Sequence, residues 1–235
     1  MNLPNAITIA RIVVAPTLAV LALAPAWPLR LIAFAVFVIA AVTDYIDGKL
    51  ARERNLVTNL GRLLDPLADK VLLVATLLPV YILQGTGADG TQPSAALALL
   101  PSAWREALPF VTAGGSVGLP LWVLVIVLGR EVFMTAFRQT AAWRGVVIGA
   151  IGSAKLKTGF QWVWIGTALF WFAAARAAAV YQWQGRPLWH GSAVFIGTVG
   201  VGAMVGAVSL TLYSLAQYLR RYGGLLAHRT DHHRG

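Results

Sequence analysis

Cysteine is absent from the 235-residue sequence, and charged residues are scarce. Without cysteine, the chain has no disulfide framework and no thiolate metal site. Charged residues make up only 12% of the chain, which is about half their usual share in soluble domains. Hydrophobic residues make up 58%, the mean hydropathy is +0.69, and the apolar residues come in long uncharged blocks. This composition excludes an ordinary soluble domain and predicts a membrane protein.

Six apolar blocks approach the roughly 20 residues that a helix needs to cross a bilayer. They are Ile7–Ala24, Leu29–Ile46, Asp69–Leu83, Leu119–Phe137, Phe160–Tyr181 and Ala193–Tyr213. We therefore expect an all-α polytopic membrane protein with six transmembrane helices, forming one domain over residues 1–225 with a disordered basic tail over 226–235. The connection at about 84–118 is expected to be an external loop with an interfacial helix near Ala95–Leu100, or a re-entrant hairpin.

Lysine and arginine are unevenly distributed among the connections. Fifteen of the 19 basic residues fall in the N-terminal segment, the 44–70 and 130–157 connections and the C-terminal tail. The other four, Arg30, Arg105, Arg176 and Arg186, fall on the opposite side. The positive-inside rule then predicts a protein of the inner, cytoplasmic membrane with both termini in the cytoplasm. The net charge of +10 has the same origin and attracts anionic headgroups, so no nucleic-acid partner is expected.

Acidic residues number only nine, and four of them gather at the predicted cytoplasmic edge: Asp44, Asp47, Asp65 and Asp69. Their spacings of three and four residues put each pair on one helix face. Pro66 suits the first turn of the third span, which makes Asp65 its expected N-cap. Adjacent helices joined by Gly48–Leu64 would bring the pairs together, and converging carboxylates repel unless cations lie between them. Oxygen ligands of this kind favour two Mg²⁺ or Mn²⁺ ions, an arrangement used for phosphoryl displacement.

Small and basic residues between the two aspartate pairs suit a phosphate ligand. Gly48, Ala51 and Gly61 leave the backbone open to close approach. Arg52 can pair with a phosphate through two hydrogen bonds, and Thr58 adds a hydroxyl. The plainer interpretation makes the aspartates helix caps and salt-bridge partners of nearby arginines. Four carboxylates at this spacing, with glycines between them, favour the metal site.

Together these residues form the pattern Asp44-x2-Asp47-Gly48-x2-Ala51-Arg52-x8-Gly61-x3-Asp65-x3-Asp69. The pattern resembles, at every fixed position, the signature of the CDP-alcohol phosphotransferase family. The resemblance implies a six-helix membrane enzyme, usually a homodimer, that moves a phosphoryl group from a CDP-linked donor to an alcohol and releases CMP. It further implies that Asp69 is the general base. The residues assigned to the CDP-diacylglycerol site are Asn5, Thr8, Gly48, Ala51, Arg52, Thr58 and Gly61.

The acceptor alcohol is indicated by other stretches. Asn2–Arg11, Gly129–Val132 and Lys155–Thr158 resemble bacterial phosphatidylglycerophosphate synthases, which implies the acceptor glycerol 3-phosphate. An anionic acceptor needs a cationic pocket. The residues expected to form it are Arg130, Arg138, Lys155 and Lys157. Each of these also fits a contact with lipid headgroups, and Glu131 is expected to play a supporting structural role.

Several alternatives remain open at this stage. Relatives that use inositol phosphate need the same basic pocket, and serine and phosphatidylglycerol are further acceptors within the family. An aspartate-rich membrane prenyltransferase also holds a diphosphate through Mg²⁺, although it usually has two separate aspartate motifs. A cation transporter would use carboxylates as an ion path, but it should place them towards the midplane of the membrane.

Overall fold

Six helices and one small β-hairpin make up the part of the chain that the computed structural model describes, which is residues 3–53, 59–84, 106–144, 146, 149 and 152–222. The helices are α1 (Leu3–Leu23), α2 (Trp27–Glu53), α3 (Asn59–Gln84), α4 (Leu121–Trp143), α5 (Gly152–Val180) and α6 (Pro187–Tyr222). The strands β1 (Phe110–Thr112) and β2 (Gly115–Val117) pair in antiparallel register. The predicted tail, 226–235, lies outside the described residues.

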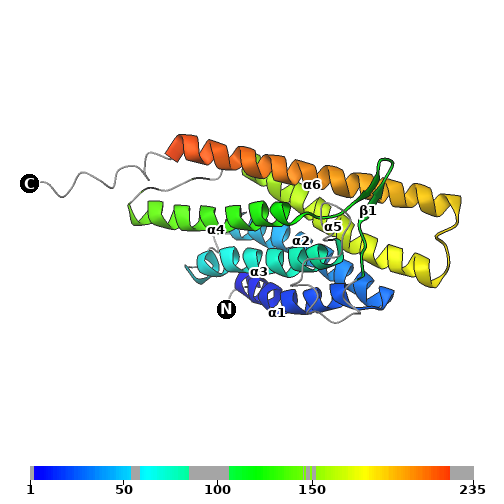
Figure 1. Cartoon of the computed structure of the whole chain (residues 1–235). Helices are drawn as coiled ribbons and strands as arrows, with labels where there is room; N and C mark the ends of the chain where they lie inside the picture. Colours follow the sequence, from blue (N-terminus) through cyan, green and yellow to red (C-terminus); the bar gives the residue numbers. More distant parts are fainter. Residues whose placement is uncertain are drawn as a thin grey trace, which may run out of the picture.

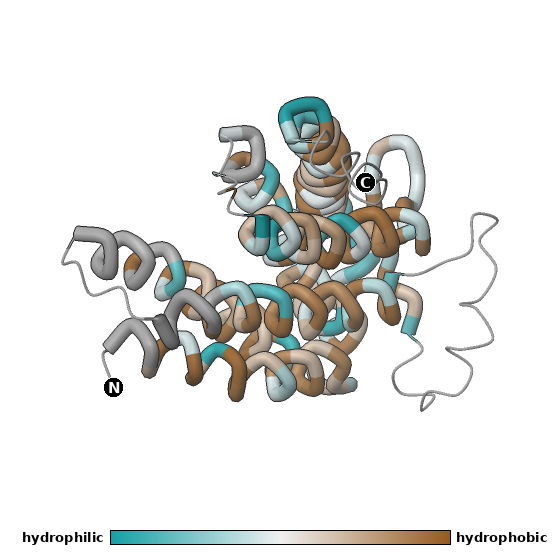
Figure 2. Tube along the Cα trace, turned by 90° about the vertical axis from the view of Figure 1, so that its left-hand side faces the viewer, coloured by the Kyte–Doolittle hydropathy of each residue, from teal (hydrophilic) through white to brown (hydrophobic). Residues whose placement is uncertain are grey.

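Five of the six helices are long and apolar enough to cross a membrane, so the chain is a multi-pass membrane protein. These spans are Ala6–Leu23, Trp27–Asp44, Pro66–Gln84, Leu156–Val180 and Pro187–Tyr222. Helix α4 is not among them, because Arg130, Glu131 and Arg138 interrupt its apolar sequence. It nevertheless runs alongside the other helices, and hydrophobic residues cover long stretches of the bundle (Figures 1 and 2).

Helix α5 lies at the centre of the packing. It contacts α2, α3 and α6, while α1 packs against α2 and α3, and α4 packs against α3 and α6. Trp164 and Phe172 of α5 are fully buried in the main apolar core. Because lipid is as apolar as leucine, helices in a membrane associate through close packing rather than through hydrophobic burial. Gly206 of α6 follows this rule, since a Cβ atom there would lie 2.6 Å from the Phe160 ring.

Helix α3 begins earlier than the sequence predicts. It starts at Asn59 rather than near Asp69, so Pro66 lies inside the helix. The prediction that Asp65 caps this helix is therefore wrong. Helix α2 likewise continues to Glu53, so Gly48 and Gly61 lie on helices rather than in a long connection. A polar helix extension reads as a loop in a hydropathy scan, which explains both errors.

The segment before α4 returns to the bundle. The Leu108 amide donates to the carbonyl of Leu83 at 2.6 Å, and the Leu119 amide donates to that of Gln84 at 3.0 Å. Between them the hairpin packs against α6, where Phe110 is buried. The interfacial helix expected near Ala95–Leu100 lies outside the described residues. The β-hairpin formed by β1 and β2 was not predicted.

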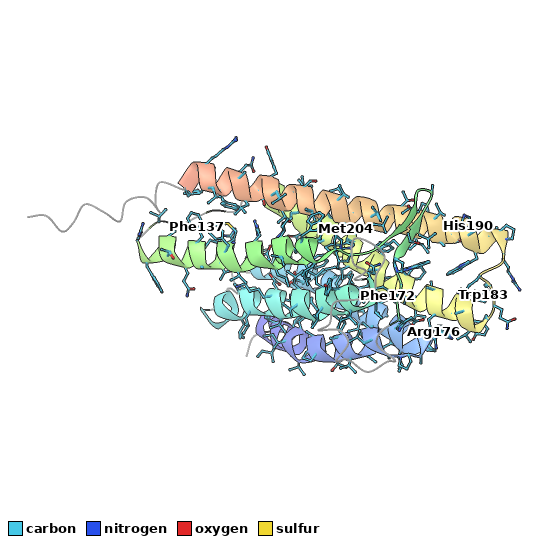
Figure 3. The ribbon with its side chains drawn as sticks, in the orientation of Figure 1. Phe137, Phe172, Arg176, Trp183, His190 and Met204 are labelled. Atoms are coloured by element: carbon cyan, nitrogen blue, oxygen red, sulfur yellow. The ribbon has the colours of Figure 1, made fainter. Side chains whose placement is uncertain are left out.

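An ionic cluster fixes the same segment at the end of the bundle where α1 ends. Arg30 is fully buried and pairs with Glu106 at 2.9 Å, while Arg176 pairs with Glu106 at 3.4 Å. The Arg30 guanidinium also donates to the Ala24 carbonyl at 2.7 Å. Arg176, Trp183 and His190 lie towards this end, and Phe137 lies at the other (Figure 3).

Candidate active site

Arg11 of α1 joins two of the four signature aspartates. Its guanidinium forms an ion pair with Asp44 of α2 and lies 3.5 Å from a carboxylate oxygen of Asp69 on α3. The Arg11 side chain is only 5% exposed, whereas that of Asp69 is 64% exposed. Three helices therefore bring one cation and two carboxylates together at the edge of the bundle.

The other signature positions lie on the same helices. Residue 47 is one turn beyond Asp44 on α2, and residue 65 is one turn before Asp69 on α3. Thr8 is buried on α1, one turn from Arg11. The remaining assigned side chains lie outside the described set: Asn5, Asp47, Ala51, Arg52, Thr58, Asp65 and Lys155.

The described residues fit a divalent metal in part. Asp44 and Asp69 supply oxygen donors, the ligand type that Mg²⁺ and Mn²⁺ prefer. Among the side chains that the structure describes, no group of three His, Cys, Asp or Glu converges. Asp44 and Asp69 are two of the four aspartates expected to bind metal, and their ion pairs with Arg11 show that this position attracts positive charge.

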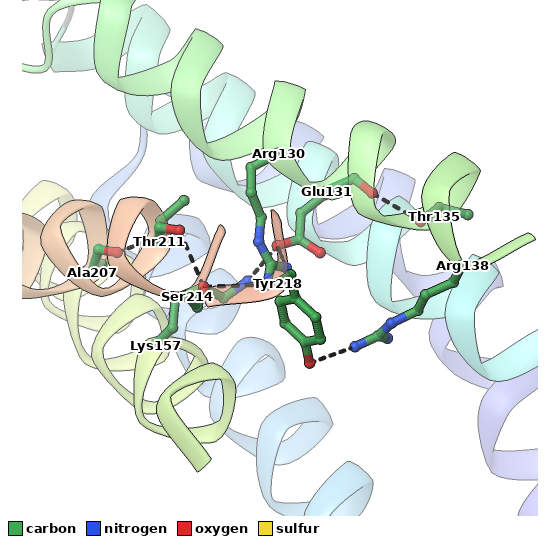
Figure 4. A network of polar contacts seen from close by, with 9 residues as sticks. All are labelled: Arg130, Glu131, Thr135, Arg138, Lys157, Ala207, Thr211, Ser214 and Tyr218. Carbon is green, nitrogen blue, oxygen red and sulfur yellow. Dashed lines mark hydrogen bonds and ion pairs between the residues drawn. The ribbon is translucent and has the colours of Figure 1, made fainter. Parts of the chain in front are cut away.

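A second charged network joins α4, α5 and α6 (Figure 4). The Glu131 carboxylate accepts a hydrogen bond from Arg130 at 2.9 Å and forms an ion pair with Lys157. Lys157 and Arg130 are both buried. The other terminal nitrogen of Arg130 donates to the Ser214 hydroxyl at 3.3 Å. Glu131 thus contacts both cations, and its supporting role stays a prediction.

Arg138 lies two turns further along α4 and is held by α6. Its guanidinium donates to the Tyr218 hydroxyl at 3.1 Å and lies 5.5 Å from the centre of the tyrosine ring. The same hydroxyl donates to the Gly149 carbonyl at 3.3 Å. The Tyr218 ring is completely buried against Met134 and Phe137.

One polar cavity connects the aspartates with the basic network. It has a volume of about 120 Å³, and its polar lining includes Asp44 from α2, Asp69 from α3, Glu131 from α4, and Lys157 and Gln161 from α5. Arg130 and Arg138 do not line it, but Arg130 contacts the lining residue Glu131. Residues more than 80 positions apart in sequence therefore face the same space.

Sequence reasoning missed three residues that organise the site. Arg11 was noted only as a basic residue in a family-like stretch, yet it bridges Asp44 and Asp69. Ser214 and Tyr218 were not singled out, because the sequence of an apolar helix does not show which residues its serine and tyrosine side chains contact. Their complete burial is visible only in the folded chain.

Comparison with known proteins agrees with this geometry. The sequence profile described as CDP-alcohol phosphatidyltransferase matches residues 1–185, which is well over half of the chain. The chain belongs to the CDP-alcohol phosphatidyltransferase family. It is therefore a phosphatidyltransferase of phospholipid biosynthesis, and membership implies CDP-diacylglycerol as donor in a family that is generally metal-dependent. This membership argues against the prenyltransferase and transporter alternatives.

Several relatives within the CDP-alcohol phosphatidyltransferase family carry a more specific name. The CDP-diacylglycerol–glycerol-3-phosphate 3-phosphatidyltransferase of Bacillus subtilis is 34% identical over 180 residues, covering 72% of this chain and 76% of the relative. A protein of the same name from Rickettsia typhi is 30% identical over 173 residues, covering 74% and 89%. CDP-diacylglycerol–glycerol-3-phosphate 3-phosphatidyltransferase 2 of Arabidopsis thaliana is 26% identical over 227 residues, covering 94% of this chain and 79% of the relative.

Proposed function

We propose that this phosphatidyltransferase uses sn-glycerol 3-phosphate as its acceptor, producing phosphatidylglycerophosphate and CMP. The observation that carries the proposal is the single cavity in which Asp44 and Asp69 face Glu131 and Lys157. A phosphatidyl donor held at the aspartates would thus lie beside a basic network able to hold an anionic acceptor. The names of the relatives from Bacillus, Rickettsia and Arabidopsis support the same acceptor.

The aspartate side of the cavity is the proposed donor site. Asp44, Asp47, Asp65 and Asp69 would hold two Mg²⁺ or Mn²⁺ ions, which when bound neutralise the diphosphate and the charge that leaves with CMP. Thr8 lines the same side of α1 as Arg11 and would contact the nucleotide. The other residues proposed for CDP-diacylglycerol follow the family signature: Asn5, Gly48, Ala51, Arg52, Thr58 and Gly61.

Asp69 is the proposed general base. Its exposed carboxylate lines the cavity, where it can accept the proton of the acceptor hydroxyl. The hydroxyl oxygen then forms a bond to the phosphorus that bears diacylglycerol. The bond from that phosphorus to the bridging oxygen breaks, and the oxygen leaves as part of CMP. The ion pair with Arg11 places a positive charge beside Asp44, the second carboxylate next to the reacting group.

The acceptor phosphate is proposed to bind at the basic network. Arg130, Arg138 and Lys157 carry three positive charges against the one negative charge of Glu131. The surplus of two charges matches the dianion of a phosphomonoester. The Glu131 carboxylate balances part of the positive charge of buried Arg130 and Lys157 before substrate binds. Lys155 joins the set by the family resemblance.

The proposed setting is the inner membrane, with the cavity on the cytoplasmic side, where CDP-diacylglycerol and glycerol 3-phosphate meet. Lysine and arginine placement supports this orientation. The sixth crossing by α4 and a homodimeric assembly are likewise proposed, the latter from the family.

An acceptor panel tests the proposal. Purified protein in detergent receives CDP-diacylglycerol, Mg²⁺ and one of four acceptors: glycerol 3-phosphate, inositol 1-phosphate, serine or phosphatidylglycerol. We expect CMP release with glycerol 3-phosphate to exceed release with serine or phosphatidylglycerol, which lack a phosphomonoester, at least about tenfold, the effect of one well-placed charged contact. It should also exceed release with inositol 1-phosphate. Faster release with any other acceptor would contradict the assignment.

A further inference from the structure

Helix α6 contributes two polar side chains to the basic network from beyond the region that the family profile matches, which ends at residue 185. Ser214 and Tyr218 are four residues apart, so both lie on one face of α6. Both are completely buried, and each contacts one arginine of α4 (Figure 4). Two consecutive turns of α6 therefore face two arginines spaced along α4.

We propose that Tyr218 and Ser214 are positioning residues that set the affinity for the acceptor phosphate by fixing Arg138 and Arg130. Neither residue lines the cavity, and each contacts one of the two arginines, so each is assigned a positioning role rather than a catalytic one. The inference rests on the proposed function, because it assigns the two arginines to the acceptor.

The hydroxyl of Tyr218 is directed by a second contact. It has one proton, which it donates to the Gly149 carbonyl. Its lone pairs are then available to the Arg138 guanidinium at 3.1 Å. Arg138 is otherwise an exposed, flexible side chain, and ordering such a side chain on binding costs free energy. The contact with Tyr218 orders Arg138 before the acceptor binds, so this ordering does not reduce the affinity for the acceptor.

Ser214 orders the Arg130 side chain in a similar way. Its hydroxyl donates to the Thr211 carbonyl at 3.1 Å, which turns a lone pair towards Arg130. The other terminal nitrogen of Arg130 is held by Glu131 at 2.9 Å. A guanidinium fixed at two nitrogens keeps one orientation, as binding of a phosphate at a set position requires.

Tyr218→Phe tests the proposal, because it removes the hydroxyl and keeps the buried ring. We expect the KM for glycerol 3-phosphate to rise roughly tenfold, with the KM for CDP-diacylglycerol and the melting temperature little changed. Tyr213→Phe is the matched control, since Tyr213 lies on the same helix and is 57% exposed. A purely structural role would move both KM values together, and that result would overturn the proposal.

A double-mutant cycle with Arg138→Met identifies the route of the effect. If Tyr218 acts through Arg138, Tyr218→Phe adds nothing to the acceptor KM of the Arg138→Met enzyme. Fully additive effects would overturn the inference. If Tyr218→Phe fails to fold, Ser214→Ala provides the same test, with Ser209→Ala at an exposed position of α6 as its control. An unchanged KM for glycerol 3-phosphate in Ser214→Ala would overturn the inference. If the wild-type enzyme instead rejects glycerol 3-phosphate, the proposed function fails independently of these variants.

Discussion

The guanidinium of Arg11 faces two carboxylates, Asp44 and Asp69, that belong to different helices. Two carboxylates held at one place repel each other, and a buried cation between them relieves that repulsion. A divalent metal would relieve the same repulsion. Arg11 and the proposed metal ions therefore act on the same carboxylates.

Arg11→Met should make the stability of the protein depend more strongly on Mg²⁺. In EDTA we expect its melting temperature to fall by roughly 5 °C, which corresponds to about 2 kcal/mol for a chain of this size. Saturating Mg²⁺ should restore more of the melting temperature in the variant than it adds to the wild type. Differential scanning fluorimetry with and without EDTA measures both. An identical response to Mg²⁺ in the two proteins would argue against a metal at Asp44 and Asp69.

Asp69→Asn should nearly abolish turnover, because the amide cannot accept the proton of the acceptor hydroxyl. A positioned general base contributes about 10²- to 10⁴-fold. We expect the rate of CMP release to decrease by a factor in that range while the protein stays folded in detergent. Asp231→Asn, in the C-terminal tail, is the control and should keep wild-type activity. A variant at Asp69 with unchanged CMP release would refute the role as base.

Among individual residues, the sequence predicted contacts only where the residues belong to a motif with fixed spacing. Two adjacent helices were predicted to bring the aspartate pairs together, and Asp44 and Asp69, the two whose side chains are described, do line one cavity. The link from Glu131 to Lys157 could not be read from the sequence, since it depends on how α4 and α5 pack. The prediction that Asp65 is an N-cap was wrong because the residues before it continue the helix.

Among the elements, α6 and the hairpin approach each other so closely that only glycine fits between them. A Cβ atom on Gly197 would lie 1.8 Å from the Val111 carbonyl oxygen. One on Gly200 would lie 2.3 Å from the Phe110 ring. The hairpin thus uses α6 as its support, and through residues 118–120 it fixes the start of α4.

Gly197→Ala and Gly202→Ala should shift stability in opposite directions. Gly202 has open space around it, so alanine there gains about 0.5 to 1 kcal/mol of helix propensity. At Gly197 the methyl group collides with backbone, and overpacking costs about 1 to 3 kcal/mol. Melting temperatures in one detergent compare the two variants directly. Equal shifts in the same direction would show that the hairpin does not rest on Gly197.

Hydrophobic blocks predicted all six helices, but not their polar ends. The block predicted at Phe160–Tyr181 overlaps α5, which ends at Val180 but begins earlier, at Gly152, and includes Lys157 of the cavity. Lys157 lies in such a polar extension, where a hydropathy scan has least power. The hairpin was missed although Ala113-Gly114 gives a two-residue turn, because strands of three residues leave little pattern.

For the whole molecule, the start of α1 and the end of α6 lie at the same end of the bundle (Figure 1). The ends of α2 and α4 and the starts of α3 and α5 reach this end too, and they carry the cavity residues. The Arg30–Glu106–Arg176 cluster lies at the opposite end. One end of the molecule therefore carries the cavity, and the other is held by ionic contacts between Glu106 and two helices.

Single cysteines report which end faces the cytoplasm, because the natural chain has none. Gln184→Cys marks the end beyond α5, and Gln139→Cys marks the end near the cavity; both positions are exposed. In intact spheroplasts a membrane-impermeant maleimide should label Gln184→Cys, and it should label Gln139→Cys only after lysis. The reverse pattern would place the cavity on the outer side.

The central claim is that the phosphatidyl group is transferred to glycerol 3-phosphate. The most direct measurement mixes CDP-diacylglycerol, Mg²⁺ and equal concentrations of glycerol 3-phosphate, inositol 1-phosphate and serine with the purified protein, and identifies the lipid formed by mass spectrometry. We predict phosphatidylglycerophosphate as the main product, formed in equal amount to CMP. A product dominated by phosphatidylinositol phosphate or phosphatidylserine would contradict the claim.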